Sequence, residues 1–195
     1  FQEMKDYIRN ILKKFSRIIY WILPLEFFPK KPDLERDLWE DCTRDCYKHF
    51  KEYFKQSLLI NNSKGIRGYA IKKSVAKDKE QNYYYLEFGV WKGESSNFFS
   101  KYVKKLYAFD SFEGLKEDWA GTDYQASYFN LSKKPKFNSN IEPVVGYVQD
   151  TLDNFTTKYS PKINFMHMDM DTYESTRYVL DKLKSSLVPG AIIIF

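Results

Sequence analysis

The chain has 195 residues, of which 43% are hydrophobic and 18% aromatic, and its formal net charge is +5. This length suits one domain with additional elements, and the apolar content is sufficient for a packed core. No stretch has the roughly 20 apolar residues of a transmembrane helix, which argues against an integral membrane protein. Because the basic residues are spread along the chain, their excess favours no particular class of partner.

The first 23 residues have the pattern of an amphipathic helix. Apolar residues recur at steps of three and four, and most basic residues lie off that stripe. Such a helix can pack on its own domain or form a homo-oligomer, which we favour, or it can make peripheral contact with an anionic membrane. The apolar stripe consists of Phe1, Met4, Ile8, Ile11, Phe15, Ile18 and Ile22.

A second helix is predicted to begin near Asp33, a good N-cap residue, and to end at Asn61–Gly65. Cys42 and Cys46 lie four residues apart in it, so we expect them on one packing surface rather than in a disulfide or metal site. Nothing demands an oxidising compartment, and we expect a cytoplasmic protein. A third, weaker helix covers 66–77. We therefore expect an N-terminal helical extension at 1–64 and a second domain at 65–195.

From Tyr83 onward, short apolar strands alternate with helices, which is typical of an α/β fold with a mostly parallel sheet. After the first strand we expect strands at 106–110, 142–145, 163–168 and 191–195, the last one beginning after a turn at Pro189-Gly190. The sequence stops on that strand and does not begin with Met. We therefore expect a piece of a longer chain, with C-terminal strands missing.

The segment from Tyr83 to Asp110 has the outline of a nucleotide-binding βαβ unit. An aromatic strand runs into a turn with Gly89 and Gly93, and a second strand ends in Asp110, 21 residues after Gly89. Acidic side chains at Glu87 and Glu94 are poorly suited to a phosphate and better suited to a cationic ligand such as a sulfonium cofactor. The alternative is a structural strand–turn–helix whose glycines have no ligand.

Two carboxylates, Asp169 and Asp171, follow the predicted fourth strand, at the sheet edge where ligands of α/β proteins collect. If the strand geometry continues, both side chains point to one side. They could ligate Mg²⁺, or one could act as a general base. The alternative for Asp171 is a helix cap near Thr172. We expect His167 to be buried and hydrogen-bonded rather than catalytic.

After Leu115, a polar, aromatic insertion extends to about Asn140 and includes Trp119, Gly121, Tyr124, Tyr128 and Phe129. Insertions of this length that follow the carboxyl end of a strand usually form binding loops or lids. Aromatic side chains here would stack equally well on a sugar or on a phenol.

Four motifs in register resemble the class I S-adenosylmethionine-dependent methyltransferases, specifically the macrocin O-methyltransferase-like group. They are EFGVWKG at 87–93, FDSFEGL at 109–115, GYVQDTL at 146–152 and DMDTYEST at 169–176. The resemblance covers about residues 83–195 and implies a Rossmann-like fold. The activity that it implies is methyl transfer to a hydroxyl, in several members on a sugar.

The resemblance also implies a set of site residues. Asp110 would bind the ribose, Gln149 and Asp150 would lie at the adenine, and Asp171 would be the candidate base, with Asp169 as a catalytic metal ligand. The acidic pair that completes the family's Mg²⁺ site would lie beyond Phe195, so the sequence contains half of that site. The implied cofactor-binding residues are Glu87, Phe88, Gly89, Gly93, Ser95, Asp110, Ser111, Gln149, Asp150 and Asp169.

Three functions remain open. The leading one is an O-methyltransferase acting on a sugar or a glycosylated small molecule, assisted by Mg²⁺. The second is an O-methyltransferase with a phenol- or catechol-like acceptor, and the third is a non-catalytic cofactor-binding module that acts through its N-terminal helix. A nucleic acid acceptor is not expected, because residues 169–172 (DMDT) do not form the Asn/Asp-Pro-Pro-aromatic motif that such enzymes carry after the fourth strand.

Overall fold

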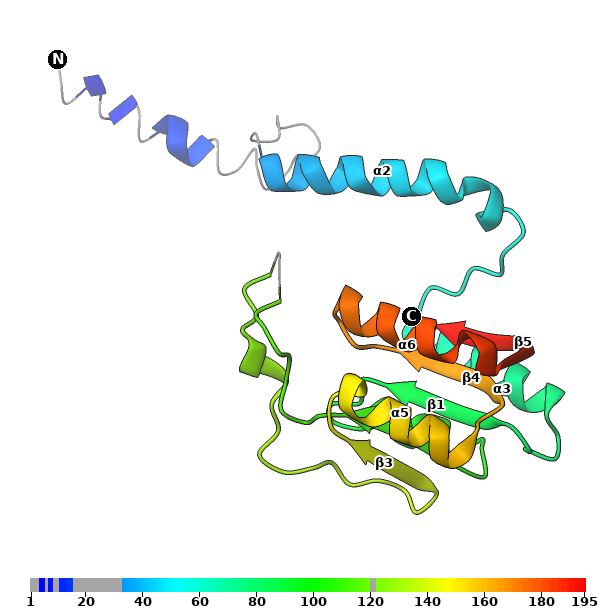
Figure 1. The fold of residues 1–195 in the computed structure, drawn as a ribbon. Coiled ribbons are helices and arrows are strands. Elements are labelled where there is room, and N and C mark those ends of the chain that lie inside the picture. The colour runs from blue at the N-terminus through cyan, green and yellow to red at the C-terminus, as the bar shows by residue number, and fades with distance from the viewer. Residues whose placement is uncertain (1–3, 6, 9–10, 16–32, 120–121) are drawn as a thin grey trace. The chain divides into compact units, whose positions relative to one another are not determined.

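The computed structural model describes residues 4–5, 7–8, 11–15, 33–119 and 122–195 (Figure 1). The chain divides into two compact units, Phe1–Leu59 and Ile60–Phe195. Part of the predicted first helix lies outside the described residues, but the described residues from 4 to 15 are helical. The domain boundary predicted at 64–65 falls inside helix α3 (Ser63–Lys77). No helix within the described ranges is long and apolar enough to cross a membrane.

In the N-terminal unit, helix α2 (Leu34–Phe54) begins where the sequence predicts. The Asp33 carboxylate accepts a hydrogen bond from the backbone N–H of Arg36 at 3.1 Å, the arrangement of an N-cap. The helix ends at Phe54, earlier than the apolar repeat suggests. None of its residues is buried, and Cys42 and Cys46 are free and exposed. The apolar residues predicted to form a packing surface are thus on the helix, but no other described residue buries them.

The second unit is built on a five-stranded, all-parallel sheet in the order β3-β2-β1-β4-β5 (Figure 1). This confirms the predicted α/β class. The strand β5 begins at Leu187, so Pro189 and Gly190 lie within the strand and do not form the predicted turn. The register between β4 and β5 shifts there. The strands are β1 (Tyr84–Phe88), β2 (Leu106–Asp110), β3 (Ile141–Val145), β4 (Ile163–Met168) and β5 (Leu187–Ile194).

Helices cover both faces of this sheet, as parallel strands require. On one face the buried side chains of α5 (Val148–Tyr159) and α6 (Tyr173–Leu183) pack with Leu86 and Phe88 of β1. On the other face α3 and α4 (Glu94–Phe99) pack with Tyr85. Alternation along β1 therefore points Glu87, like Tyr85, toward α3 and α4.

Candidate active site

A cavity of about 360 Å³ lies at the carboxyl ends of β1, β2 and β4. This is the edge at which open α/β sheets bind their ligands. Its lining includes seven of the residues predicted from the sequence. They are Gly89, Ser95, Asp110, Ser111, Gln149, Asp169 and Asp171.

The remaining predicted residues lie outside the cavity lining. Phe88 is in the core, Gly93 is buried against Pro135 and Phe137, and Asp150 is exposed on α5. Glu87 is completely buried. Contact between these four residues and a cofactor remains a prediction.

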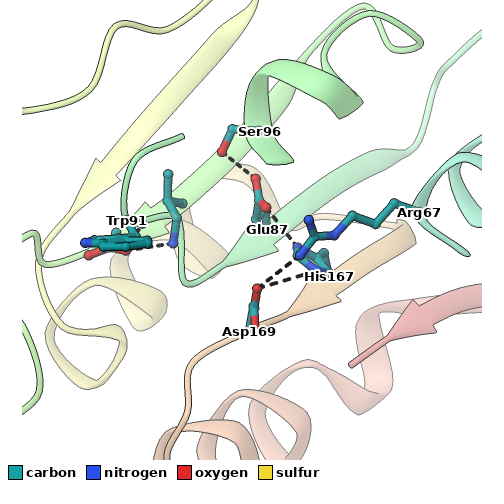
Figure 2. A network of polar contacts seen from close by, with 8 residues as sticks. Arg67, Glu87, Trp91, Ser96, His167 and Asp169 are labelled. Atoms are coloured by element: carbon teal, nitrogen blue, oxygen red, sulfur yellow. Dashed lines mark hydrogen bonds and ion pairs between the residues drawn. The ribbon is translucent and has the colours of Figure 1, made fainter. Parts of the chain in front are cut away.

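Glu87 is the centre of a buried polar network (Figure 2). The Ser96 hydroxyl donates a hydrogen bond to one oxygen of its carboxylate, and His167 Nδ1 lies 2.8 Å from the other. The register of the sheet explains the second contact, because Glu87 and His167 are paired residues of neighbouring strands. His167 is thus buried and hydrogen-bonded, as predicted. A buried carboxylate needs such partners, since desolvation without them is costly.

Asp110 holds the turn that follows β1. Its Oδ2 accepts hydrogen bonds from the backbone N–H groups of Val90 (2.7 Å) and Trp91 (2.8 Å). Its Oδ1 accepts a third from the N–H of Phe112 at 2.7 Å. The sequence predicts a ribose ligand at this position but not this backbone role. A carboxylate has about four lone-pair directions, so Oδ1 retains capacity for one more donor.

The same turn requires glycine at position 89. Gly89 has a φ of +82°, and a Cβ atom there would lie 1.9 Å from the carbonyl oxygen of Asp169. No side chain fits in that space, and the positive φ is itself unfavourable for residues with a Cβ. The glycine therefore lets the turn after β1 approach the end of β4 closely.

Asp169 and Asp171 have different surroundings. Asp169 Oδ2 lies 3.4 Å from Arg67 Nη2 and 3.9 Å from His167 Nε2 (Figure 2). Asp171 has a φ of +61°, and the N–H of Thr172 donates to the carbonyl of Met170 at 2.6 Å, which closes a tight turn around it. The strand geometry therefore does not continue to Asp171, but both carboxylates line the cavity.

Asp171 is not the cap of the following helix. Helix α6 has Thr172 as its N-cap residue, without a side-chain capping bond. Asp171 is exposed at the cavity, but neighbouring protein atoms shield part of its carboxylate from water. This partial burial, followed by the negative charges of Asp169 and Asp110, raises the pKa of Asp171 to about 6. A carboxylate of this basicity can accept a proton near neutral pH.

Gln149, which lines the cavity from α5, has an unused acceptor. Its Nε2 donates to the Ser175 hydroxyl at 3.4 Å, but its Oε1 is buried without a hydrogen-bond partner among the described residues. Buried polar atoms are normally paired, so a ligand with an N–H donor, such as an adenine amino group, would satisfy it.

The described residues include no group of three or more His, Cys, Asp and Glu side chains placed to hold a metal ion. Asp169, the predicted Mg²⁺ ligand, has the Arg67 guanidinium beside it instead. These residues alone therefore do not fit a protein-held metal.

Aromatic side chains of the insertion gather beside the cavity. Phe129 lines it, and the ring of Trp91, which also lines it, lies 5.8 Å from Phe129 and 6.5 Å from Tyr128 between centroids. Trp119 and Tyr124 extend the cluster, with centroids 6.0 Å apart. The insertion predicted as a binding loop thus borders the cavity.

Comparisons with known proteins bear on the family and the fold of this chain. A family model described as a methyltransferase domain matches residues 86–195, more than half of the chain. The crystal structure of CalS11, a calicheamicin methyltransferase, matches with a TM-score of 0.55 and 15% identity, covering 88% of this chain and 80% of that one. The apo structure of CalS11, described as a TDP-rhamnose 3'-O-methyltransferase, gives a TM-score of 0.47 and 14% identity over 88% and 81%. No curated protein matches. The chain therefore belongs to the methyltransferase domain family, and it is an S-adenosylmethionine-dependent methyltransferase with a Rossmann-like fold.

Proposed function

We propose that this protein methylates a hydroxyl group of a sugar or of a glycosylated small molecule. The observation that carries the proposal is the position of Asp171. Its carboxylate lines the cavity, has a pKa raised to about 6, and accepts no hydrogen bond from the described residues. A hydroxyl acceptor needs a group that removes its proton as the methyl group is transferred, and a positioned base of this kind contributes about 10²–10⁴-fold to the rate.

The other cavity residues suit the cofactor. S-adenosylmethionine, when bound, supplies an electrophilic methyl group on a sulfonium. The buried Oε1 of Gln149 would accept the adenine amino group, and the remaining lone pair of Asp110 Oδ1 would accept a ribose hydroxyl. Asp110 also fixes the turn after β1, so the cavity floor is preorganised before a ligand arrives.

The acceptor is proposed from the aromatic cluster at Trp91, Trp119, Tyr124, Tyr128 and Phe129. Rings of this kind stack on the apolar face of a sugar. Polar cavity residues nearby, among them Lys116, Glu117 and Glu174, could bind its hydroxyl groups. The similarity to CalS11 supports the fold only, so the sugar rests on the cluster and on the family resemblance of the motifs.

Mg²⁺ at Asp169 is implied by that resemblance, but the described residues do not fit the ion by themselves. We therefore assign proton removal to Asp171 alone. Activity that survives a strong chelator would support this assignment. Loss of activity that only Mg²⁺ restores would show that Asp169 serves a metal.

The test of the proposed function is a methylation assay with a panel of nucleotide sugars, glycans and catechols. Mass spectrometry should detect the gain of one methyl group on a sugar, together with S-adenosylhomocysteine. If only catechols are methylated, the acceptor is a phenol and the proposed sugar acceptor is wrong. Cofactor binding without transfer to any acceptor would favour a non-catalytic module.

We also propose that the N-terminal helices pack on a partner copy in preference to a membrane. Helix α2 presents large apolar side chains, including Leu38, Trp39 and Phe50, that the described residues leave exposed. Light scattering should give a mass above that of one chain for residues 1–195 and a lower state for residues 60–195. Binding of the full chain to anionic liposomes would instead favour the membrane role.

A further inference from the structure

Arg67 reaches the cavity from outside the segment that matches the methyltransferase family. It belongs to α3, which precedes the first strand, and it is the one α3 residue that lines the cavity. Its Nη2 lies 3.4 Å from Asp169 Oδ2 (Figure 2). The side chains are 32% and 50% exposed, so both charged groups are accessible to a ligand in the cavity.

Arg67 differs from the other two cations in the lining. The ammonium of Lys92 lies over the ring of Trp91, 3.8 Å from its centroid, and that of Lys116 lies over the ring of Tyr147 at 4.6 Å. Arg67 instead lies against a carboxylate, and within the described part of the chain this is the ion pair formed between two lining residues. The cavity thus presents a guanidinium and a carboxylate side by side.

If the protein binds S-adenosylmethionine, as the proposed function requires, the sheet order indicates which end of the cofactor lies near Arg67 and Asp169. Gln149 follows β3 and Asp110 ends β2, so the nucleoside half of the cofactor would lie over those strands. The sheet order β3-β2-β1-β4-β5 then directs the amino-acid half toward β1 and β4. Arg67 and Asp169 are found at the end of β4, next to the turn at Gly89.

We propose that Arg67 and Asp169 form a zwitterion clamp for the amino-acid end of S-adenosylmethionine. Asp169 receives the ammonium group and Arg67 receives the carboxylate, two groups that the ligand carries on a single carbon. The guanidinium fork matches a carboxylate with two parallel N–H···O bonds. The Arg67–Asp169 contact is longer than a typical charge-assisted hydrogen bond of about 2.7–2.9 Å, so the pair is loose enough to open for the ligand.

The test compares two ligands that differ only in the carboxylate, S-adenosylmethionine and decarboxylated S-adenosylmethionine. Calorimetry on the full chain should show that Arg67→Met weakens S-adenosylmethionine binding roughly 10- to 100-fold, the effect of losing charged hydrogen bonds. The same variant should bind the decarboxylated ligand as tightly as the wild type does. Arg67→Lys, which keeps the charge but not the fork, should give an intermediate loss.

Lys64→Met is the matched control, since it removes one positive charge from the same helix at a residue that does not line the cavity. It should leave both affinities unchanged. Unchanged S-adenosylmethionine binding by Arg67→Met would overturn the clamp, and so would an equal loss for both ligands, which would indicate a structural role. If the wild type binds neither ligand, the proposed function fails and the clamp fails with it.

Discussion

The two sides of the cavity use their carboxylates in opposite ways. On the β1–β2 side, Glu87 and Asp110 are engaged by the protein itself, through Ser96 and His167 in one case and three backbone N–H groups in the other. On the β4 side, Asp169 has only long contacts, with Arg67 and His167, and Asp171 accepts no hydrogen bond from the described residues. The first pair of carboxylates is bonded within the protein, Glu87 to side chains and Asp110 to the backbone, and the second pair is available to ligands and protons.

Non-glycine residues with a positive φ occur on both sides. Trp91, in the turn after β1, has a φ of +46°, Phe112, after β2, has +59°, and Asp171 has +61° in a turn of three residues. A non-glycine residue in this region is strained and persists because the surrounding structure imposes it. Such strain is commonly found at functional sites, and Trp91 and Asp171 both line the cavity.

The largest effect is expected at Asp171. Asp171→Asn should lower turnover about 10²–10⁴-fold while the affinity for S-adenosylmethionine is unchanged, because a base acts in the transition state. Asparagine tolerates a positive φ, so the turn should be preserved. Single-turnover rates and calorimetry measure the two quantities, with Asp181→Asn on the exposed face of α6 as the control. Undiminished turnover would make Asp171 a structural turn residue.

The next effect concerns stability. Glu87→Ala leaves the hydroxyl of Ser96 and the ring nitrogen of His167 without their buried partner, and should lower the free energy of unfolding by about 2–5 kcal/mol. Asp169→Asn, on the open side, should lower it by less than about 1 kcal/mol, because its ion pair is exposed. Urea denaturation measures both. Equal losses would remove the distinction between the two sides.

Substitutions of Asp110 test whether the β1–β2 side also contributes to cofactor binding. Asp110→Ala removes the acceptor of three backbone N–H groups, and should weaken cofactor binding roughly 10- to 100-fold. Asp110→Asn keeps one carbonyl acceptor and should lose less. Isothermal calorimetry gives both affinities, and wild-type binding by the alanine variant would contradict the assignment.

The smallest effect is a shift in pH dependence. The proposed base works when ionised, so kcat/KM should fall as the pH drops below the Asp171 pKa of about 6. The charge of Asp169 contributes to that raised pKa. Asp169→Asn removes a negative neighbour, stabilises ionised Asp171 and should move the acid limb of the profile to lower pH. A limb that stays in place would exclude this coupling.

The arrangement of the sheet was predictable because it depends on local patterns. Apolar runs gave the strands, and the carboxyl ends of parallel strands meet at one edge, so motifs spread from residue 87 to residue 176 could be expected near one cavity. Seven of the predicted site residues do line it. The burial of Glu87 was also encoded, because alternation along β1 turns it toward α4.

The contribution of Arg67 was not predictable. In sequence it is one of several basic residues of α3, and nothing local marks which of them turns toward the cavity. The bracing role of Asp110 depends on bonds to residues 19 and 20 positions away, which only the folded chain defines. The end of α2 at Phe54 and the early start of β5 at Leu187 were missed because apolar periodicity does not fix where an element stops or begins.

The close approach of Gly89 to the carbonyl of Asp169 bears on how this motif would be inherited. Any side chain at position 89 would collide with the backbone of the neighbouring strand end, whether or not a cofactor is present. A descendant of this chain that had lost methyl transfer would still be held to glycine there by the fit of the two strands. In this lineage Gly89 would therefore be retained for the fold alone. Asp169 and Asp171, the exposed carboxylates that follow β4, would be the positions free to change once activity was lost.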